Sequence, residues 1–135
     1  MRKKIKCLLS IILSMLFIFS LTITVGAIEP RYSDTDSITI ALGFIGTTAN
    51  CSVIINGADG TTSIDSVNIT LKDSNGNTKK EWKNLSSNSK NFNFYETVSD
   101  LTKGETYTLE LSANINRKNN TESIKKSRTQ TCPSK

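Results

Sequence analysis

The sequence predicts an all-β fold, a sandwich of seven antiparallel strands, on three observations. Apolar and polar residues alternate in several short segments, as in Ile38, Ile40, Leu42 and Phe44, which is typical of a strand with one buried face. Clusters of Gly, Asn, Asp and Ser separate these segments at close spacing. No segment after residue 27 has a convincing helical period. Short strands at such spacing favour two packed sheets.

Residues 1–27 are predicted to be a signal peptide. Four basic residues precede an apolar run over residues 8–25, and small residues at 25–27 precede a cleavage point after Ala27. An uncleaved anchor is the alternative, because the run is near the minimum that spans a bilayer. The small residues favour cleavage, so we expect a secreted, extracellular chain with no stable membrane insertion.

The mature part, residues 28–135, is expected to fold as one domain. Its 108 residues suffice for a modest core. Removing the four basic leader residues leaves 13 Lys and Arg against 12 Asp and Glu, a net charge of +1. Net charge therefore gives no support to nucleic-acid binding.

The domain is expected over residues 37–132, after an extended, loosely held lead-in at 28–36 and before a tail at 133–135. Ile64 is out of parity with Val67, Ile69 and Leu71, which predicts a bulge or bend there. The expected strands are 37–44, 49–55, 64–71, 79–85, 92–98, 107–115 and 122–131.

The segment Leu101-Thr-Lys-Gly104-Glu-Thr-Tyr107 predicts a crossing from one sheet to the other. A leucine, a glycine-containing turn and a tyrosine that opens a strand are the setting of a tyrosine corner. In such a corner the ring is buried and its hydroxyl bonds to upstream backbone. We expect Leu101, Gly104 and Tyr107 to stabilise the fold.

The resemblance to known domains extends beyond this corner. It includes two strand patterns and a strand between them that carries Trp82. The patterns are Ile64-x-x-Val67-x-Ile69-x-Leu71 and Tyr107-x-Leu109-x-Leu111. The order resembles an immunoglobulin-like or fibronectin type III domain and, more narrowly, is similar to small single-domain secreted proteins of Gram-positive bacteria. The resemblance covers most of residues 37–132 and implies an immunoglobulin-like sandwich. It transfers no functional residue.

The sequence departs from both relatives. Antibody domains carry a cysteine on the strand that corresponds to 107–115, which this chain lacks, and type III domains commonly have proline near Gly104 and no cysteine pair. Cys51 and Cys132 remain after leader removal, and an even pair in an exported protein predicts one disulfide. It would close a loop of about 80 residues and contribute about 4–5 kcal/mol. Two free thiols are the alternative.

The implied topology assigns the two ends of the sandwich. Cys51 and Cys132 are expected at one pole. Three free loops, 56–62, 85–90 and 116–121, are expected at the other, where binding commonly occurs because a rigid scaffold holds the loops.

Basic residues concentrate in the last part of the chain. One interpretation is a surface for teichoic acid, anionic lipid or acidic glycan; the other, which we favour, is an edge strand protected by charge. The residues concerned are Arg117, Lys118, Lys125, Lys126, Arg128 and Lys135.

Trp82 and the Asp73–Asn77 turn each have a functional and a structural interpretation. Trp82 is either a platform for sugar stacking or a residue packed over the sheet edge. The large area that a tryptophan side chain buries favours packing. The turn begins like a calcium loop, but Thr78 and Asn84 stand where that loop needs Gly and Glu. A plain turn is favoured, and no metal is expected.

No catalytic constellation is present in the sequence. It contains no histidine, no nucleophile elbow and no phosphate loop. We therefore expect neither an enzyme nor a cofactor.

The predicted function is binding at the cell surface or extracellularly. Candidate partners are an anionic cell-wall polymer, a glycan or a surface protein. The alternatives are a structural or self-associating exported protein with no specific ligand, and a small glycan-binding module that uses Trp82.

Overall fold

The computed structural model describes residues 31–135. The predicted signal peptide, residues 1–27, and the start of the lead-in lie outside the described residues. Within the described part, no helix is long and apolar enough to cross a membrane.

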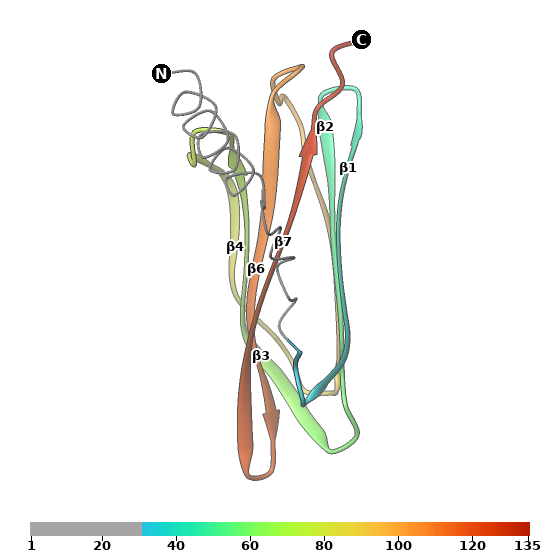
Figure 1. Cartoon of the computed structure of the whole chain (residues 1–135), viewed down its shortest axis with the longest axis vertical. Coiled ribbons are helices and arrows are strands. Elements are labelled where there is room, and N and C mark those ends of the chain that lie inside the picture. Colours follow the sequence, from blue (N-terminus) through green and yellow to red (C-terminus); the bar gives the residue numbers. More distant parts are fainter. Residues whose placement is uncertain (1–30) are drawn as a thin grey trace, which may run out of the picture. The chain divides into compact units, whose positions relative to one another are not determined.

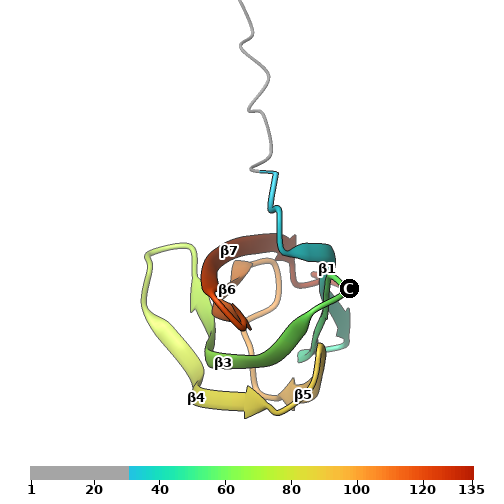
Figure 2. The ribbon, with the colours of Figure 1, turned by 90° about the horizontal axis from the view of Figure 1, so that it is seen from below.

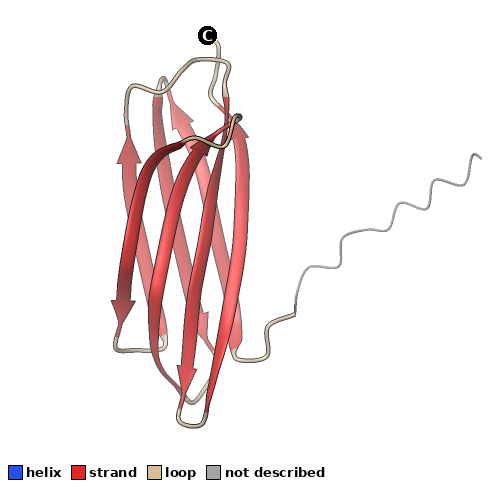
Figure 3. Cartoon of the chain, turned by 90° about the vertical axis from the view of Figure 1, so that its left-hand side faces the viewer, coloured by secondary structure: helices blue, strands red, loops and turns tan. Residues whose placement is uncertain are grey.

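The described residues form seven strands in two antiparallel sheets (Figures 1 and 3). One sheet has the order β1-β2-β5 and the other the order β4-β3-β6-β7, which confirms the predicted all-β class with seven strands. The strands are β1 (Thr35–Ile45), β2 (Thr48–Gly57), β3 (Thr61–Asp73), β4 (Thr78–Ser87), β5 (Asn91–Val98), β6 (Thr106–Arg117) and β7 (Asn120–Thr131).

Alternation along the strands directs one face of each sheet into a shared core. Every second residue of β6 from Tyr107 to Ile115 is buried, and β2 contributes Cys51, Val53 and Ile55 in the same way. Viewed from below, the strands surround this core (Figure 2). Burying each large aliphatic side chain stabilises the fold by about 1.5–3 kcal/mol.

A bulge interrupts β3 near its start, where the sequence predicted one. The pairing of β3 with β4 shifts between Ile64 and Val67, and its pairing with β6 shifts in the same region. Ser66 in the bulge has φ of 50°, and Asn84 on β4 has φ of 55°, a conformation uncommon for residues other than glycine. Because bulges bend strands and increase their twist, this part of the four-stranded sheet is locally reshaped.

Side-chain contacts join the edges of the two sheets on both sides. Trp82 of β4 packs edge-on against Phe94 of β5, with ring centroids 5.0 Å apart. On the other side, Lys126 of β7 donates from Nζ to the carbonyl of Ile38 in β1 at 3.2 Å. These contacts cover strand edges that would otherwise offer pairing groups to another chain.

The lead-in is held more firmly than the sequence suggested. The Glu122 carboxylate accepts hydrogen bonds from the backbone N–H groups of Ser33 and Asp34, at 2.6 Å and 2.9 Å. Tyr32 contacts the backbone of Lys125, and β1 begins at Thr35 rather than at residue 37. The prediction of a loosely held segment is therefore wrong for residues 32–36, because acceptors on β7 bind it.

Candidate functional site

The predicted corner residues bury the ring of Tyr107 and engage its hydroxyl within the segment. Tyr107 is fully buried; its hydroxyl accepts from the Thr102 N–H at 2.9 Å and donates to Glu105 Oε2 at 3.2 Å. Leu101 is buried beside it. Gly104 has φ of 75°, which glycine adopts without steric cost.

The two cysteines are buried and unbonded, which corrects the predicted disulfide. The sulfur of Cys132 lies 3.5 Å from the carbonyl oxygen of Gly46, in the turn between β1 and β2. Cys51 lies opposite Leu42, three residues beyond the first residue of β2, or about 10 Å along the strand. Burial raises the pKa of the Cys51 thiol to about 11.

Contacts bring together the three loops that were predicted to share the other pole. Lys90 pairs with Asp59 at 2.7 Å, and Arg117 donates from Nη2 to the Asp59 carbonyl. Arg117 also pairs through Nη1 with Asp34 at 2.8 Å, and Asn120 donates to the same carboxylate at 2.5 Å. Since Asp34 is only 5% exposed, Arg117 neutralises a buried charge and is not a free binding group.

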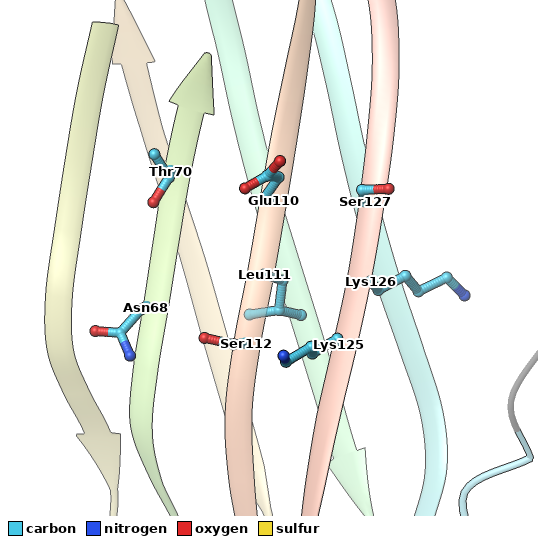
Figure 4. A pocket seen from close by; sticks show the side chains of 8 residues that line it. All are labelled: Asn68, Thr70, Glu110, Leu111, Ser112, Lys125, Lys126 and Ser127. Atoms are coloured by element: carbon cyan, nitrogen blue, oxygen red, sulfur yellow. The ribbon is translucent and has the colours of Figure 1, made fainter. Parts of the chain in front are cut away.

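Strand alternation divides the remaining basic residues between different surfaces. Lys126 points toward β1 and bonds to its backbone. Its neighbour Lys125 is exposed and projects from the opposite face of β7, the outer face of the four-stranded sheet (Figure 4). Arg128 shares the parity of Lys126, and Lys118 lies in the turn after β6; both are exposed. The predicted basic surface is thus not one surface.

Trp82 is half-buried against the core. Its indole meets Phe94 at an interplanar angle of 70°. This contact matches the packing interpretation of the tryptophan and leaves less of the ring available for stacking.

The turn that resembled a calcium loop is built around a buried carboxylate. Asp73 accepts hydrogen bonds from the N–H groups of Asn75 and Asn77 and pairs with Lys79 at 3.1 Å. Burial raises the pKa of Asp73, but these donors outweigh that effect and lower it to about 2. The carboxylate is satisfied within the turn itself.

The outer face of the four-stranded sheet is polar, and its cross-strand pairs are bonded toward both ends. Between β6 and β7, hydroxyl and amide groups of facing residues lie 2.8–2.9 Å apart. The bonded pairs are Thr106–Thr131, Thr108–Thr129, Asn114–Ser123 and Asn116–Thr121.

The two facing pairs between these bonded pairs lack such cross-strand bonds, and they line a hollow. Glu110 faces Ser127, and Ser112 faces Lys125, with no hydrogen bond between partners among the described residues. The hollow has a volume of about 430 Å³, and residues from β3, β6 and β7 line it (Figure 4). Its lining is Asn68, Thr70, Glu110, Leu111, Ser112, Lys125, Lys126 and Ser127.

Asn68 connects the hollow to the bulge. Its Oδ1 accepts from the N–H of Asn84 at 3.1 Å, and its Nδ2 donates to the carbonyl of Ser66 at 2.9 Å. One side chain therefore braces Ser66 and Asn84, which are two of the three non-glycine residues with positive φ in residues 31–135, the third being Asp100. Sparsely populated backbone conformations cost about 1–3 kcal/mol each and cluster at functional sites. Their position beside the hollow marks this part of the sheet as the candidate site.

Sequence reasoning missed every residue of the hollow except Lys125 and Lys126. Apart from the buried Leu111, the missed residues belong to the polar phase of β3, β6 and β7, which outward-facing strand residues normally show. The alternation of side chains along a strand could have assigned Lys125 and Lys126 to opposite faces of the sheet, because neighbouring strand residues point to opposite faces.

Comparison with known proteins adds no assignment. No protein-family model matches this chain, and no curated protein matches it. The structure alone therefore defines the protein, as a small all-β domain of two antiparallel sheets.

Proposed function

We propose that this chain is a secreted immunoglobulin-like module that binds a hydroxyl-rich partner on the outer face of its four-stranded sheet, at the cell surface or in the extracellular medium. Export follows from the predicted leader at residues 1–27. The character of the hollow supports binding as the activity to test first, because it is open and most of the side chains that line it carry polar groups that can donate or accept hydrogen bonds.

The strand order supports the immunoglobulin-like part of the proposal. Lettering the strands A to G in chain order places A, B and E in one sheet and C, F and G in the other, as in immunoglobulin domains. The fourth strand lies beside C instead of beside E. This arrangement agrees with the predicted likeness to fibronectin type III domains.

The observation that carries the binding proposal is the interruption of the polar ladder. Bonded pairs flank the hollow on both sides along β6 and β7. The hydroxyls of Thr70, Ser112 and Ser127 have no hydrogen-bond partner among the described residues. Unpaired hydroxyls at the centre of a rigid sheet are free to bind a polar partner, because each is both donor and acceptor.

Filling the hollow tests the proposal. Ser127→Leu places an apolar side chain into it, whereas Ser123→Leu makes the same change on the same face of β7 outside the hollow. We expect binding to a glycan array and to isolated Gram-positive cell wall to fall at least about tenfold in Ser127→Leu, from lost hydrogen bonds of about 1.4 kcal/mol or more. The Ser123→Leu control should stay within about twofold. Equal binding by both variants would reject the hollow as the site.

Self-association is the second candidate, favoured by the outer face of the other sheet. Ile45 and Tyr95 are 76% and 65% exposed there, and Ile54 adds a third apolar side chain. Sedimentation velocity over a hundredfold concentration range separates the two ideas. A monomer at all concentrations excludes self-association, whereas a dimer that Tyr95→Ser dissociates supports it.

A further inference from the structure

We infer that the partner of the hollow is a polyhydroxylated chain with anionic groups, and that Lys125 recognises the anion. This inference rests on the proposed function of the hollow. It replaces the predicted six-residue basic surface with one lysine surrounded by hydroxyls.

The charges around the hollow leave a single uncompensated cation. Glu110 pairs with Lys72, Nζ to Oε2, at 2.7 Å, so this carboxylate is neutralised. Lys126 lines the hollow, but its ammonium group reaches away to Ile38 (Figure 4). Within residues 31–135, Lys125 forms no ion pair. The hollow therefore carries a local charge of about +1, which favours an anion.

Tyr32 fixes the backbone of Lys125. The tyrosine hydroxyl donates to the Lys125 carbonyl at 2.7 Å and accepts from the Lys125 N–H at 3.1 Å. Both bonds lie at the outer edge of β7, where no further strand pairs. A single hydroxyl thus replaces a strand neighbour at this residue. Tyr32 is a positioning residue that keeps the Lys125 side chain on the outer face.

The groups around Lys125 match the rest of such a chain. Ser112 faces Lys125 directly across the strand pair, and Ser127 and Thr70 add hydroxyls within the same hollow. Hydroxyls donate and accept, so they suit the hydroxyls of a sugar or polyol. The lysine adds a point charge that suits either carboxylate or phosphate. Anionic lipid is less suitable because the outer face of the hollow lacks exposed apolar side chains.

The test uses short oligomers, so that multivalency does not mask single contacts. Trigalacturonate supplies carboxylates, a glycerol phosphate trimer supplies phosphates, and isomaltotriose is the neutral probe. Titration calorimetry on the purified protein compares wild type with Lys125→Gln and with Arg128→Gln, the control on the same strand and the opposite face. At low salt we expect Lys125→Gln to weaken binding of at least one acidic oligomer about two- to fivefold, the range of an exposed ion pair. Arg128→Gln should leave it unchanged.

The two acidic probes identify the source of the anion, and the neutral probe tests the inference itself. Equal affinity for trigalacturonate and isomaltotriose, with both lost in Ser127→Leu, would overturn the role of Lys125 and leave the proposed function standing. Binding of none of the three probes would overturn both.

Tyr32→Phe tests positioning separately from stability. It should reduce the preference for the acidic over the neutral oligomer while affinity for the neutral oligomer stays the same. Equal weakening of both would assign Tyr32 a purely structural role.

Discussion

At the scale of single residues, the hydroxyl of Tyr107 is expected to stabilise the fold, and a substitution that removes this one oxygen atom tests it. Tyr107→Phe removes the acceptor of the Thr102 N–H, and we expect the free energy of unfolding to fall by about 1–2 kcal/mol. Urea denaturation measures the change. Tyr95→Phe is the control, because its hydroxyl bonds Asn50 on an exposed surface. A Tyr107→Phe variant as stable as the control would contradict the corner.

Asp73 predicts how stability responds to acid. Its folded-state pKa of about 2 lies below the ordinary aspartate value of 3.8. A carboxylate with a lowered pKa stabilises the fold above its unfolded pKa, and that contribution is lost as pH falls through the window from about 4 to about 2. The melting temperature of wild type should fall through this window. Asp73→Asn should lose part of that pH dependence and be less stable at pH 6; an unchanged pH profile would refute the role.

The buried thiols predict slow modification in the folded protein. With a pKa of about 11, Cys51 at pH 8 carries roughly a hundredfold less thiolate than an ordinary cysteine. We expect a thiol reagent to label Cys51 slowly in buffer and to label both Cys51 and Cys132 in strong denaturant without reductant. If the denatured protein is labelled only after reductant is added, the two cysteines form a disulfide and the assignment of free thiols is wrong.

At the scale of elements, the contact of Arg117 with the lead-in is the interaction most exposed to mutation. Arg117→Met leaves the Asp34 carboxylate buried without its ion pair, and we expect a loss of about 1.5–3 kcal/mol. Lys118→Met removes the neighbouring exposed charge and should cost less than about 0.5 kcal/mol. Chemical denaturation of both variants compares them directly, and similar losses would contradict the assignment.

The elements themselves followed from sequence, whereas the pairing of side chains across them did not. Alternation in β2, β3 and β6 predicted their buried faces, and the displaced Ile64 predicted the bulge. The firm attachment of the lead-in at residues 32–36 was missed, because its bonds to Glu122 and Lys125 join positions that lie about 90 residues apart along the chain. Local patterns contain no information on such contacts.

The candidate site was harder to predict than the fold for a related reason. Lys125 and Lys126 are equivalent as charges but project to opposite faces. Ser112 and Ser127 look like ordinary outward residues, and only the bonded pairs that flank them distinguish them. The count of charges indicated a six-residue surface. Lys125 and Lys126 both line the hollow, but Lys126 donates from its ammonium group to Ile38, which leaves Lys125 as the cation available there.

At the scale of the whole molecule, Trp82 reports on the joining of the two sheets. It is the only tryptophan in the chain, and it contacts Phe94 of the opposite sheet. If the sandwich unfolds as one cooperative unit, its fluorescence and the far-ultraviolet circular dichroism should change at the same urea concentration. Separate midpoints would mean that the sheets part before the strands are lost.

The position of Cys132 against Gly46 has a practical consequence for measurement. The residues after β7 leave the domain at that end, whereas Lys125 lies six residues before Thr131, the last residue of β7, or about 20 Å along the strand. A biotin or resin linkage added beyond Lys135 would therefore attach each molecule at a point away from the hollow, so that a sensor chip prepared in this way would leave the outer face of the sheet accessible to the analyte.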